Sequence, residues 1–168
     1  MTKSSSIRIR PATPGDAPFI ERVHRDAVRG SVGGPYSRAE LESWIAGLYP
    51  DRYRVAMDQL GERMLLAEAP RKAAVGFCSW REQRIIGLYV LPDFTGQGIA
   101  RRLLFMAEAA IAAAGHGEVT LGASLTALPF YERCGYRVTL RHDWKTRGGL
   151  VLPVADMAKT LTLPRVRA

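Results

Sequence analysis

The residues whose spacing points most clearly to chemistry form a short glycine-bearing segment at 95–98, Thr-Gly-Gln-Gly. It follows an apolar run that ends at Pro92, and it precedes a long helix-periodic stretch that begins at Ile99. A strand that turns tightly into a helix directs several free backbone N–H groups at one point, at the positive end of the helix dipole. Gly96 and Gly98 allow an anion to approach closely, where a Cβ would obstruct it. The segment therefore predicts a phosphate-binding loop, with a ligand-free tight turn as the alternative.

Other kinds of phosphate loop and metal site fit the sequence less well. No Gly-Lys-Ser/Thr follows the segment, as a Walker A loop requires, and the third glycine of a dinucleotide fingerprint is missing. Cys78 and Cys134 lie far apart and form no CxxC pair, and His24, His116 and His142 have no ligand spacing. We therefore expect neither a metal site nor a disulfide, which fits a reducing cytoplasm.

The charge balance points to an anionic ligand. The net charge is +8, and Arg101 and Arg102 add positive charge just after the loop. A nucleic acid, an acidic surface or a polyanionic cofactor would suit this balance. The basic residues are dispersed and form no helix-turn-helix, zinc-finger or RNA-binding pattern, so nucleic acid is the weaker choice. The sequence has neither about 18 consecutive apolar residues nor an apolar stretch after residues 1–6, so neither a membrane span nor a secretory signal is expected.

The elements that must position the loop are predicted from hydrophobic period and turn residues. Strands are expected at 7–11, 53–57, 64–67, 73–80, 85–91, 119–123, 136–140 and 150–159. Four helices are expected: at 17–28, at a second position that opens with the capping box Ser37-x-x-Glu40, at 99–114 and at 127–134. A glycine-rich break is expected at 30–35 and a hairpin turn at 81–84. These elements predict one mixed α/β domain over residues 1–168, with a core at about 7–163, a largely antiparallel first half and a loose basic tail from Pro164.

The loop and a second segment together resemble the GNAT acetyltransferases. The family's acetyl-CoA loop reads Gln/Arg-x-x-Gly-x-Gly/Ala, and residues 95–100 read Thr-Gly-Gln-Gly-Ile-Ala, with Thr95 in place of Gln or Arg. Residues 124–136 resemble the family's Asn-x-x-Ala-x-x-x-Tyr-x-x-x-Gly-Phe, with Ser124 for Asn and Tyr136 for Phe. The pattern Val154-x-x-Met157-x-Lys159 is similar to the family's last strand. The resemblance spans about residues 7–163 and implies the GNAT acyl-CoA N-acyltransferase fold, a mixed, mostly antiparallel sheet flanked by helices.

The resemblance also implies where acetyl-CoA (coenzyme A) binds. In this fold the strands equivalent to 85–90 and 119–123 splay apart, so that backbone groups near Leu88 and Val90 can pair with the pantetheine arm. Loop amides hold the pyrophosphate, and a backbone N–H near Leu88 or Tyr89 polarises the thioester carbonyl. Thr95 can still hydrogen-bond a phosphate through its hydroxyl, so its presence bears on cofactor affinity more than on cofactor identity. The implied cofactor-binding residues are Leu88, Tyr89, Val90, Thr95, Gly96, Gln97, Gly98, Ile99, Ala100, Arg101, Ser124, Ala127 and Tyr131.

Acetylation of an amine requires a neutral amine and an acid for the departing thiolate. Tyr131 is the candidate general acid, because a phenol with a reference pKa of about 10 is close enough to a thiol at about 8.5 to protonate the sulfur. A packing role on a short helix is the alternative for Tyr131. The general base is open, because the strand at 85–90 carries no carboxylate. The remaining choices are His24, Glu40, Glu42, Glu82, a water chain or direct binding of the neutral amine.

The expected function is acetyl transfer from acetyl-CoA to a primary amine of a small molecule, by direct transfer in a ternary complex. Six residues are candidates for the acceptor pocket, although each can also be a packing residue: Tyr36, Trp44, Trp80, Arg84, His142 and Trp144. The alternatives are acetylation of a peptide or protein amine, and a non-catalytic acyl-CoA-binding sensor. We expect a cytoplasmic enzyme without nucleic-acid or membrane partners, and a homodimer is compatible with the resemblance.

Overall fold

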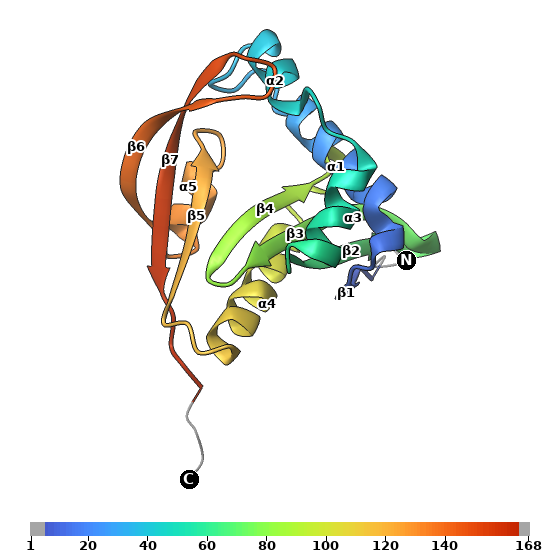
Figure 1. Cartoon of the computed structure of the whole chain (residues 1–168), viewed down its shortest axis with the longest axis vertical. Coiled ribbons are helices and arrows are strands. Elements are labelled where there is room, and N and C mark those ends of the chain that lie inside the picture. Colours follow the sequence, from blue (N-terminus) through green and yellow to red (C-terminus); the bar gives the residue numbers. More distant parts are fainter. Residues whose placement is uncertain (1–5, 165–168) are drawn as a thin grey trace.

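A computed structural model describes residues 6–164 (Figure 1). Its centre is a seven-stranded sheet in the order β1-β2-β3-β4-β5-β7-β6. The strands are β1 (Arg8–Pro11), β2 (Arg63–Ala69), β3 (Ala73–Arg81), β4 (Arg84–Val90), β5 (Glu118–Ser124), β6 (Arg137–Lys145) and β7 (Val151–Thr160). The helices are α1 (Ala17–Arg29), α2 (Arg38–Ile45), α3 (Pro50–Gln59), α4 (Ile99–Ala113) and α5 (Leu128–Arg133).

The parallel pair β4–β5 divides the sheet. All other neighbouring strands pair antiparallel, whereas β4 and β5 pair in parallel at only two positions, Arg84 with Thr120 and Ile85 with Leu121. Figure 1 shows β4 and β5 diverging beyond this point, so the sheet opens into a V. The register of β3 on β4 shifts where the opening begins, because Ile86 is left out of the pairing. The splaying implied by the resemblance is therefore present.

Both faces of β3 are buried, which explains its continuous apolar sequence. Alternate side chains point to opposite faces of a strand. Phe77 accordingly packs with Ile20 of α1 and Tyr53 of α3, while Cys78 packs with the buried leucine pair of α4. Helices α1 and α3 therefore cover one face of the β1–β4 half, and α4 covers the other (Figure 1).

The predicted strand at 53–57 is wrong, since these residues belong to α3. Pro50 starts this helix and Asp51 lies in its first turn, two features that favour a helix N-terminus. Tyr53 and Ala56 lie three residues apart and are both buried against α1. A five-residue stretch fits an alternating period as well as a helical one, and packing on α1 selects the helix.

The other predicted elements are present, with shifted ends. Ser37 and Glu40 form the predicted capping box at α2: the Ser37 N–H donates to Glu40 Oε2 (2.7 Å) and the Glu40 N–H donates to Ser37 Oγ (3.2 Å). Strand β6 runs five residues beyond its predicted end at 140, because β7 offers backbone partners as far as Lys145.

The β6–β7 turn is tied to α2 at the open end of the V. Thr146 Oγ1 lies 2.6 Å from Ser43 Oγ, and the Gly148 N–H donates to Ser43 O at 3.0 Å. A Cβ on Gly148 would lie 2.7 Å from Ser43 Cα, so only glycine allows this approach. The two halves of the sheet are thereby bridged by α1, α2 and this turn.

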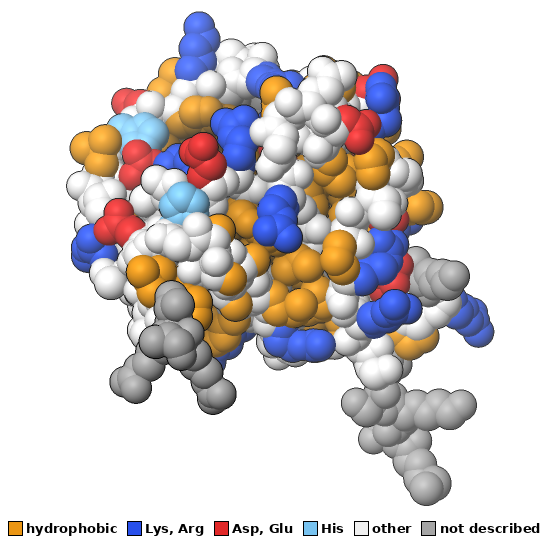
Figure 2. All heavy atoms as spheres, turned by 60° about the horizontal axis from the view of Figure 1, so that its bottom comes forward, with side chains coloured by type: hydrophobic (Ala, Val, Ile, Leu, Met, Phe, Trp, Pro, Cys, Tyr) orange, Lys and Arg blue, Asp and Glu red, His pale blue; other side chains and the backbone are white. Residues whose placement is uncertain are grey.

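Two predictions concern the ends of the chain and its organisation. Most of the segment 1–6 and of the predicted tail 164–168 lies outside the described residues. The single-domain organisation of residues 1–168 stays a prediction. None of the helices within residues 6–164 has the length and apolar character that a membrane crossing requires. On the face that Figure 2 displays, Lys and Arg side chains are scattered among acidic and hydrophobic ones rather than gathered in one patch.

Candidate active site

The glycine loop lies between β4 and α4 and has the shape expected for an anion site. Gly96 and Gly98 adopt left-handed backbone angles (φ 74° and 76°), and Gly98 is the N-cap of α4. The first helical hydrogen bond runs from the Arg102 N–H to Gly98 O (3.0 Å), which leaves the three N–H groups of residues 99–101 without a helical acceptor. A Cβ built on Gly96 or Gly98 meets no protein atom within 4 Å. The loop therefore presents free donors to open space at the positive end of α4.

Two side chains of the loop region differ in their availability. The Thr95 hydroxyl donates to Pro92 O at 2.8 Å, so its single proton is directed into the loop. Thr95 can therefore donate to a phosphate only if its hydroxyl gives up the bond to Pro92 O. The Arg101 guanidinium is exposed and lies 5.1 Å from the ring centre of Phe105. None of the ion pairs found among residues 6–164 involves Arg101, which leaves its charge free for an anion.

A cavity of about 350 Å³, here called the neutral cavity, occupies the opening between β4 and β5. It reaches from the loop, at Pro92 and Thr95, to the start of α5, at Ala127 and Tyr131. None of the described residues that line it is charged, so it suits a neutral polar chain rather than a phosphate. The full lining is Ala27, Val28, Gly30, Ser31, Trp44, Ile85, Ile86, Gly87, Leu88, Tyr89, Val90, Pro92, Thr95, Leu121, Gly122, Ala123, Ser124, Thr126, Ala127 and Tyr131.

The backbone of β4 offers hydrogen-bonding groups to this cavity at alternate residues. The Leu91 N–H donates to Val75 O of β3 at 2.8 Å, and Tyr89 faces Phe77 in the same ladder. Since N–H and C=O groups alternate sides along a strand, those of Leu88 and Val90 point away from β3 and into the opening. Of the two positions expected to polarise a carbonyl, Leu88 therefore presents its N–H to the cavity, whereas the Tyr89 N–H points to β3.

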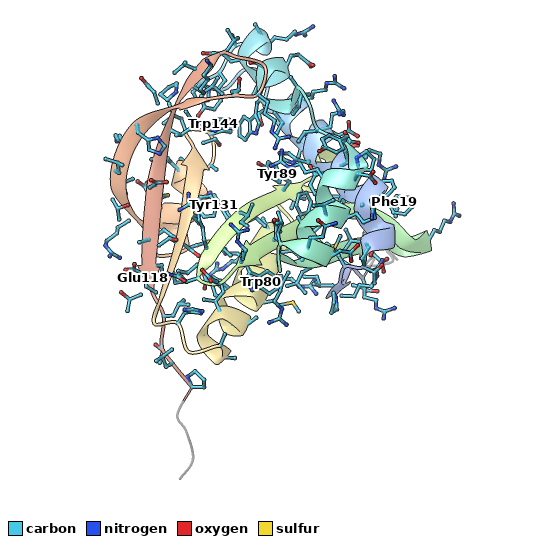
Figure 3. All side chains as sticks on the ribbon, in the orientation of Figure 1. Phe19, Trp80, Tyr89, Glu118, Tyr131 and Trp144 are labelled. Atoms are coloured by element: carbon cyan, nitrogen blue, oxygen red, sulfur yellow. The ribbon has the colours of Figure 1, made fainter. Side chains whose placement is uncertain are left out.

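Tyr131 lies on the opposite wall, on α5, and is 6% exposed. Figure 3 shows Tyr131 and Tyr89 on either side of the opening. Hydroxyl hydrogen bonds among the described residues include those of Tyr36, Tyr53 and Tyr136 but none of Tyr131. Burial raises the pKa of Tyr131 above its ordinary value of 10.0, so the phenol keeps its proton at neutral pH. The arrangement leaves one uncommitted O–H donor beside the cavity.

The start of α5 is fixed by the end of β5. The Ala127 N–H lies 3.0 Å from Ser124 O and 3.3 Å from Ser124 Oγ, so Ser124 holds the turn that begins the helix. Both residues line the neutral cavity. The predicted positions 124, 127 and 131 are therefore brought together on one wall, opposite Leu88, Tyr89 and Val90 of β4.

A second cavity of about 480 Å³, here called the charged cavity, adjoins the neutral cavity along the same strands. It shares seven lining residues with the neutral cavity: Trp44, Ile85, Ile86, Tyr89, Gly122, Ala123 and Ser124. The two cavities therefore meet at the β4–β5 opening. The remaining lining residues are His24, Leu48, Arg52, Arg84, His142, Trp144, Lys145, Arg147, Val154 and Asp156.

The predicted acceptor-pocket residues divide into two groups. Trp44, Arg84, His142 and Trp144 line the charged cavity. The other two are packing residues. The Tyr36 hydroxyl donates to Pro153 O (2.7 Å) and accepts from the Leu125 N–H (2.9 Å), and Trp80 is buried in the core beside α4.

The glutamates considered as bases lie elsewhere. Glu40 caps α2, Glu42 pairs with Arg29 at 2.8 Å, and Glu82 lies in the β3–β4 turn. The charged cavity instead includes Asp156, which sequence reasoning missed. It also includes Arg52, Lys145 and Arg147, for which the sequence offered no local pattern.

His24 is the most unusual polar group beside the charged cavity. Its Nδ1 lies 2.7 Å from the Tyr53 hydroxyl, and its ring stacks on Tyr89 with centres 3.9 Å apart. Nε2 is buried and has no hydrogen-bond partner among the described residues. Burial, followed by the charges of Arg52 and Arg25, lowers the pKa of His24 to about 3, so the imidazole is neutral at pH 7.

Comparison with known proteins decides the family, because a match to the family described as "Acetyltransferase (GNAT) domain" covers residues 33–161. The chain belongs to the GNAT acetyltransferase family. This confirms the resemblance of the two motifs, and it makes the protein an N-acetyltransferase with acetyl-CoA as its cosubstrate. The predicted GNAT fold is confirmed as well.

The relatives of this GNAT protein agree with that assignment. An uncharacterised N-acetyltransferase of Escherichia coli (strain K12), YafP, is 29% identical over 144 residues, which are 86% of this chain and 90% of YafP. A GCN5-related N-acetyltransferase structure from Rhodopseudomonas palustris superimposes with a TM-score of 0.83 at 27% identity, covering 94% of this chain and 97% of the other. The PaiA N-acetyltransferase from Thermoplasma acidophilum, in complex with coenzyme A, gives 0.73 at 24% identity, with 93% and 99% covered.

Proposed function

We propose that this GNAT protein transfers the acetyl group of acetyl-CoA directly to a primary amine of a small molecule, with both substrates bound at once. The observation that carries the proposal is that two cavities of different character meet at the β4–β5 opening. Two ligands that enter from opposite sides would bring a thioester and an amine together there. Holding both reactants in one site removes much of the entropic barrier to reaction.

In this proposal the neutral cavity and the loop bind acetyl-CoA. The free N–H groups at Gly96, Gly98, Ala100 and Arg101 bind the pyrophosphate, with Gln97 and Ile99 completing the turn. Leu88 and Val90 hydrogen-bond the pantetheine arm through their backbones, and the Leu88 N–H polarises the thioester carbonyl. Tyr89, Thr95, Ser124, Ala127 and Tyr131 form the surrounding walls.

The chemistry needs two proton transfers. The amine nitrogen forms a bond to the acetyl carbon, and the carbon–sulfur bond breaks. Tyr131 gives its proton to the departing sulfur, for which its uncommitted hydroxyl beside the cavity suits it. Burial raises the pKa of Tyr131 further above that of a thiol, so the proton moves only as negative charge develops on the sulfur. The proton released by the nitrogen leaves into the charged cavity, where the Asp156 carboxylate is able to receive it, directly or through water. The lowered pKa of His24 makes its imidazole too weak a base for this role.

The proposal includes the organisation and surroundings of the protein. We infer one domain over residues 1–168, because the single sheet takes strands from both ends of the described chain. A cytoplasmic location is supported by the two free, buried cysteines, Cys78 and Cys134. A small acceptor is supported by the volume of the charged cavity, which lies within the range of small-molecule sites. The homodimer stays a prediction.

The test is release of free CoA from acetyl-CoA by the purified protein with a panel of amines, followed by mass spectrometry of the products. Initial rates are then measured while both substrates are varied. Intersecting double-reciprocal lines are expected for a ternary complex, and parallel lines would contradict direct transfer. Acetylation of peptides but not of small amines would replace the small-molecule acceptor with a peptide. Silence with every amine, while acetyl-CoA still raised the melting temperature, would contradict the enzyme and favour a sensor.

A further inference from the structure

The charged cavity has a strong excess of positive side chains. Arg52 of α3, Arg84 of β4, Lys145 of β6 and Arg147 of the β6–β7 turn line it, against a single carboxylate, Asp156. The elements that supply these residues lie far apart in the sequence and converge only in the fold. Arg52 is half-buried and the other three are exposed, so together they give the mouth of the cavity a positive potential that favours an anion.

The one carboxylate of this cavity is already engaged. Asp156 Oδ1 lies 3.4 Å from the Arg84 guanidinium, and Oδ2 lies 3.5 Å from His142 Nε2. The ion pairs found among residues 6–164 include none made by Arg52, Lys145 or Arg147. Among residues 6–164, the Arg147 guanidinium donates over a long 3.4 Å to Gly47 O. Three cations of the charged cavity therefore lack an anionic partner within the described part of the chain.

Arg52 already acts on groups inside the site. Its positive charge is among the causes that lower the pKa of His24 and oppose the burial-driven rise in the pKa of Tyr89. Arg52 is half-buried, so its field is less screened than that of a fully exposed side chain. An anionic group in the charged cavity would lie in this field.

The phosphates of acetyl-CoA do not account for these cations. The free donors suited to a pyrophosphate lie at the loop and α4, next to the neutral cavity, where Arg101 supplies positive charge. No described charged residue lines the neutral cavity itself. The positive charge therefore gathers in the charged cavity, apart from the predicted cofactor site.

The same cavity has aromatic walls. The ring of Trp44 lies edge-on to Trp144 (centres 5.7 Å apart) and to Tyr89 (6.5 Å). Figure 3 shows Trp144 and Tyr89 on either side of the upper part of the opening. Such walls suit an apolar or aromatic body on the same molecule as the amine and an anionic group.

From these contacts we propose that the acceptor is a small primary amine that also carries a carboxylate, such as an amino acid with an apolar or aromatic side chain. The inference rests on the proposed function and specifies the acceptor of that same site. The cations hold the carboxylate, the aromatic rings hold the body, and the amine points toward the β4–β5 opening. Polyamines, which carry positive charge in place of the carboxylate, are excluded by repulsion.

The test compares matched trios of acceptors with the full-length protein. Phenylalanine, tryptophan, leucine and methionine are each assayed beside their amides and their decarboxylated amines, with spermidine as the cationic member. The carboxylate form is expected to exceed its amide at least about tenfold in kcat/KM, as hydrogen bonds to charged groups allow. The amide is the stricter comparison, because its amine is less basic and a larger share of it is neutral. Equal rates with the amides, or a preference for spermidine, would overturn the inference while leaving the proposed function intact.

Variants locate the effect in the cavity. Arg52→Gln and Lys145→Gln should each reduce the carboxylate-to-amide ratio about tenfold through KM, without changing the affinity for acetyl-CoA. Arg54→Gln is the matched control, because Arg54 lies on the same helix, is exposed and pairs with Asp51 outside the cavity. An equal loss in Arg54→Gln would contradict a local role.

A binding measurement separates the two claims. Calorimetry of the same carboxylates and amides with CoA-saturated protein reports recognition without turnover. Carboxylate-selective binding that Arg52→Gln abolishes would support the inference even if no acceptor were acetylated, an outcome that would contradict the proposed function alone. Absence of any carboxylate preference in both binding and turnover would overturn the inference.

Discussion

Replacement of Tyr131 by phenylalanine isolates the proposed proton donor. The substitution removes one hydroxyl that makes no hydrogen bond among the described residues, while the ring keeps its packing on Phe130 (5.2 Å) and Tyr136 (5.5 Å). The free energy of unfolding should therefore change by less than about 1 kcal/mol, because no partner is left unsatisfied. Loss of a general acid costs at least about 10²-fold in rate, which corresponds to roughly 2.7 kcal/mol of activation free energy.

The assay is kcat with saturating amine, together with the dissociation constant of acetyl-CoA from calorimetry. We expect kcat of Tyr131→Phe to fall about 10²-fold while acetyl-CoA affinity stays within about twofold. Tyr136→Phe is the matched control. Tyr136 is also buried against α5, but its hydroxyl donates to Glu108 Oε1 at 2.8 Å in the core. That variant should lose about 1.5–3 kcal/mol of stability and keep its kcat. Unchanged turnover in Tyr131→Phe would exclude Tyr131 as the proton donor and leave it a packing residue.

Three further predictions follow from the loop and the buried ionisable groups. Gly98→Ala should weaken acetyl-CoA binding about tenfold or more, because its Cβ would point into the open space before α4 that the phosphate is expected to fill. Gly115→Ala is the control, since Gly115 has a similar φ of 95° at the other end of α4. It should lower the free energy of unfolding by the ~1 kcal/mol of left-handed strain and leave acetyl-CoA binding unchanged. Equal binding by the two variants would contradict a phosphate site at the loop. The Arg10 guanidinium lowers the pKa of Asp16 from 3.8 to about 2. About 2 kcal/mol of stability should therefore be present above pH 4 and be lost as the pH falls toward 2, as measured by urea unfolding. Asp16→Asn should abolish this pH dependence, and a dependence that persisted in the variant would come from other carboxylates. The pKa of His24 is lowered from 6.5 to about 3, so below pH 6.5 the unfolded chain binds a proton at His24 that the folded protein does not bind. Stability should therefore fall as the pH drops below 6.5. By NMR the imidazole should not titrate between pH 5 and 8, and a midpoint near 6.5 would show that His24 is exposed to solvent.

The loop and the α5 motif could be predicted because their signals are local. Gly96, Gly98 and the helical period after residue 99 lie within one short stretch, and chain geometry alone makes such a stretch a turn into a helix. Ser124 and Tyr131 are likewise close in sequence, because Tyr131 lies on the short helix that follows the turn at Ser124. That Ser124 and Tyr131 lie across the opening from Leu88 could be predicted only from the family resemblance. In the chain, β4 and β5 are separated by the whole of α4, so no local signal relates them.

The acceptor side could be predicted only in part. Trp44, Arg84, His142 and Trp144 were anticipated from residue type, whereas Arg52, Lys145, Arg147 and Asp156 were not. These last four come from α3, from β6, from the turn that follows it and from β7, which only tertiary packing brings together. The wrong prediction of a strand at 53–57 also prevented the identification of Arg52, because Arg52 then preceded the strand and was not recognised as part of a helix that faces the site.

The choice between Leu88 and Tyr89 depended on the register of the sheet. Both residues lie on β4, and the sequence gives no sign of which backbone N–H pairs with β3. The bond from the Leu91 N–H to Val75 O decides it, because alternation then directs Leu88 to the opening. Tyr36 and Trp80 were expected in the acceptor pocket but are core residues. An aromatic side chain suits a pocket and the core equally well, and only its burial in the fold shows which of the two it occupies.

The most direct test of the central claim is a crystal structure of the protein with coenzyme A. We expect the pyrophosphate at the N–H groups before α4, the pantetheine arm along Leu88 and Val90, and the sulfur within hydrogen-bonding distance of the Tyr131 hydroxyl. The charged cavity should remain free for an amine on the other side of the opening. A coenzyme A molecule whose sulfur lay away from Tyr131, or whose phosphates bound to Arg52 and Lys145 in the charged cavity, would contradict the account.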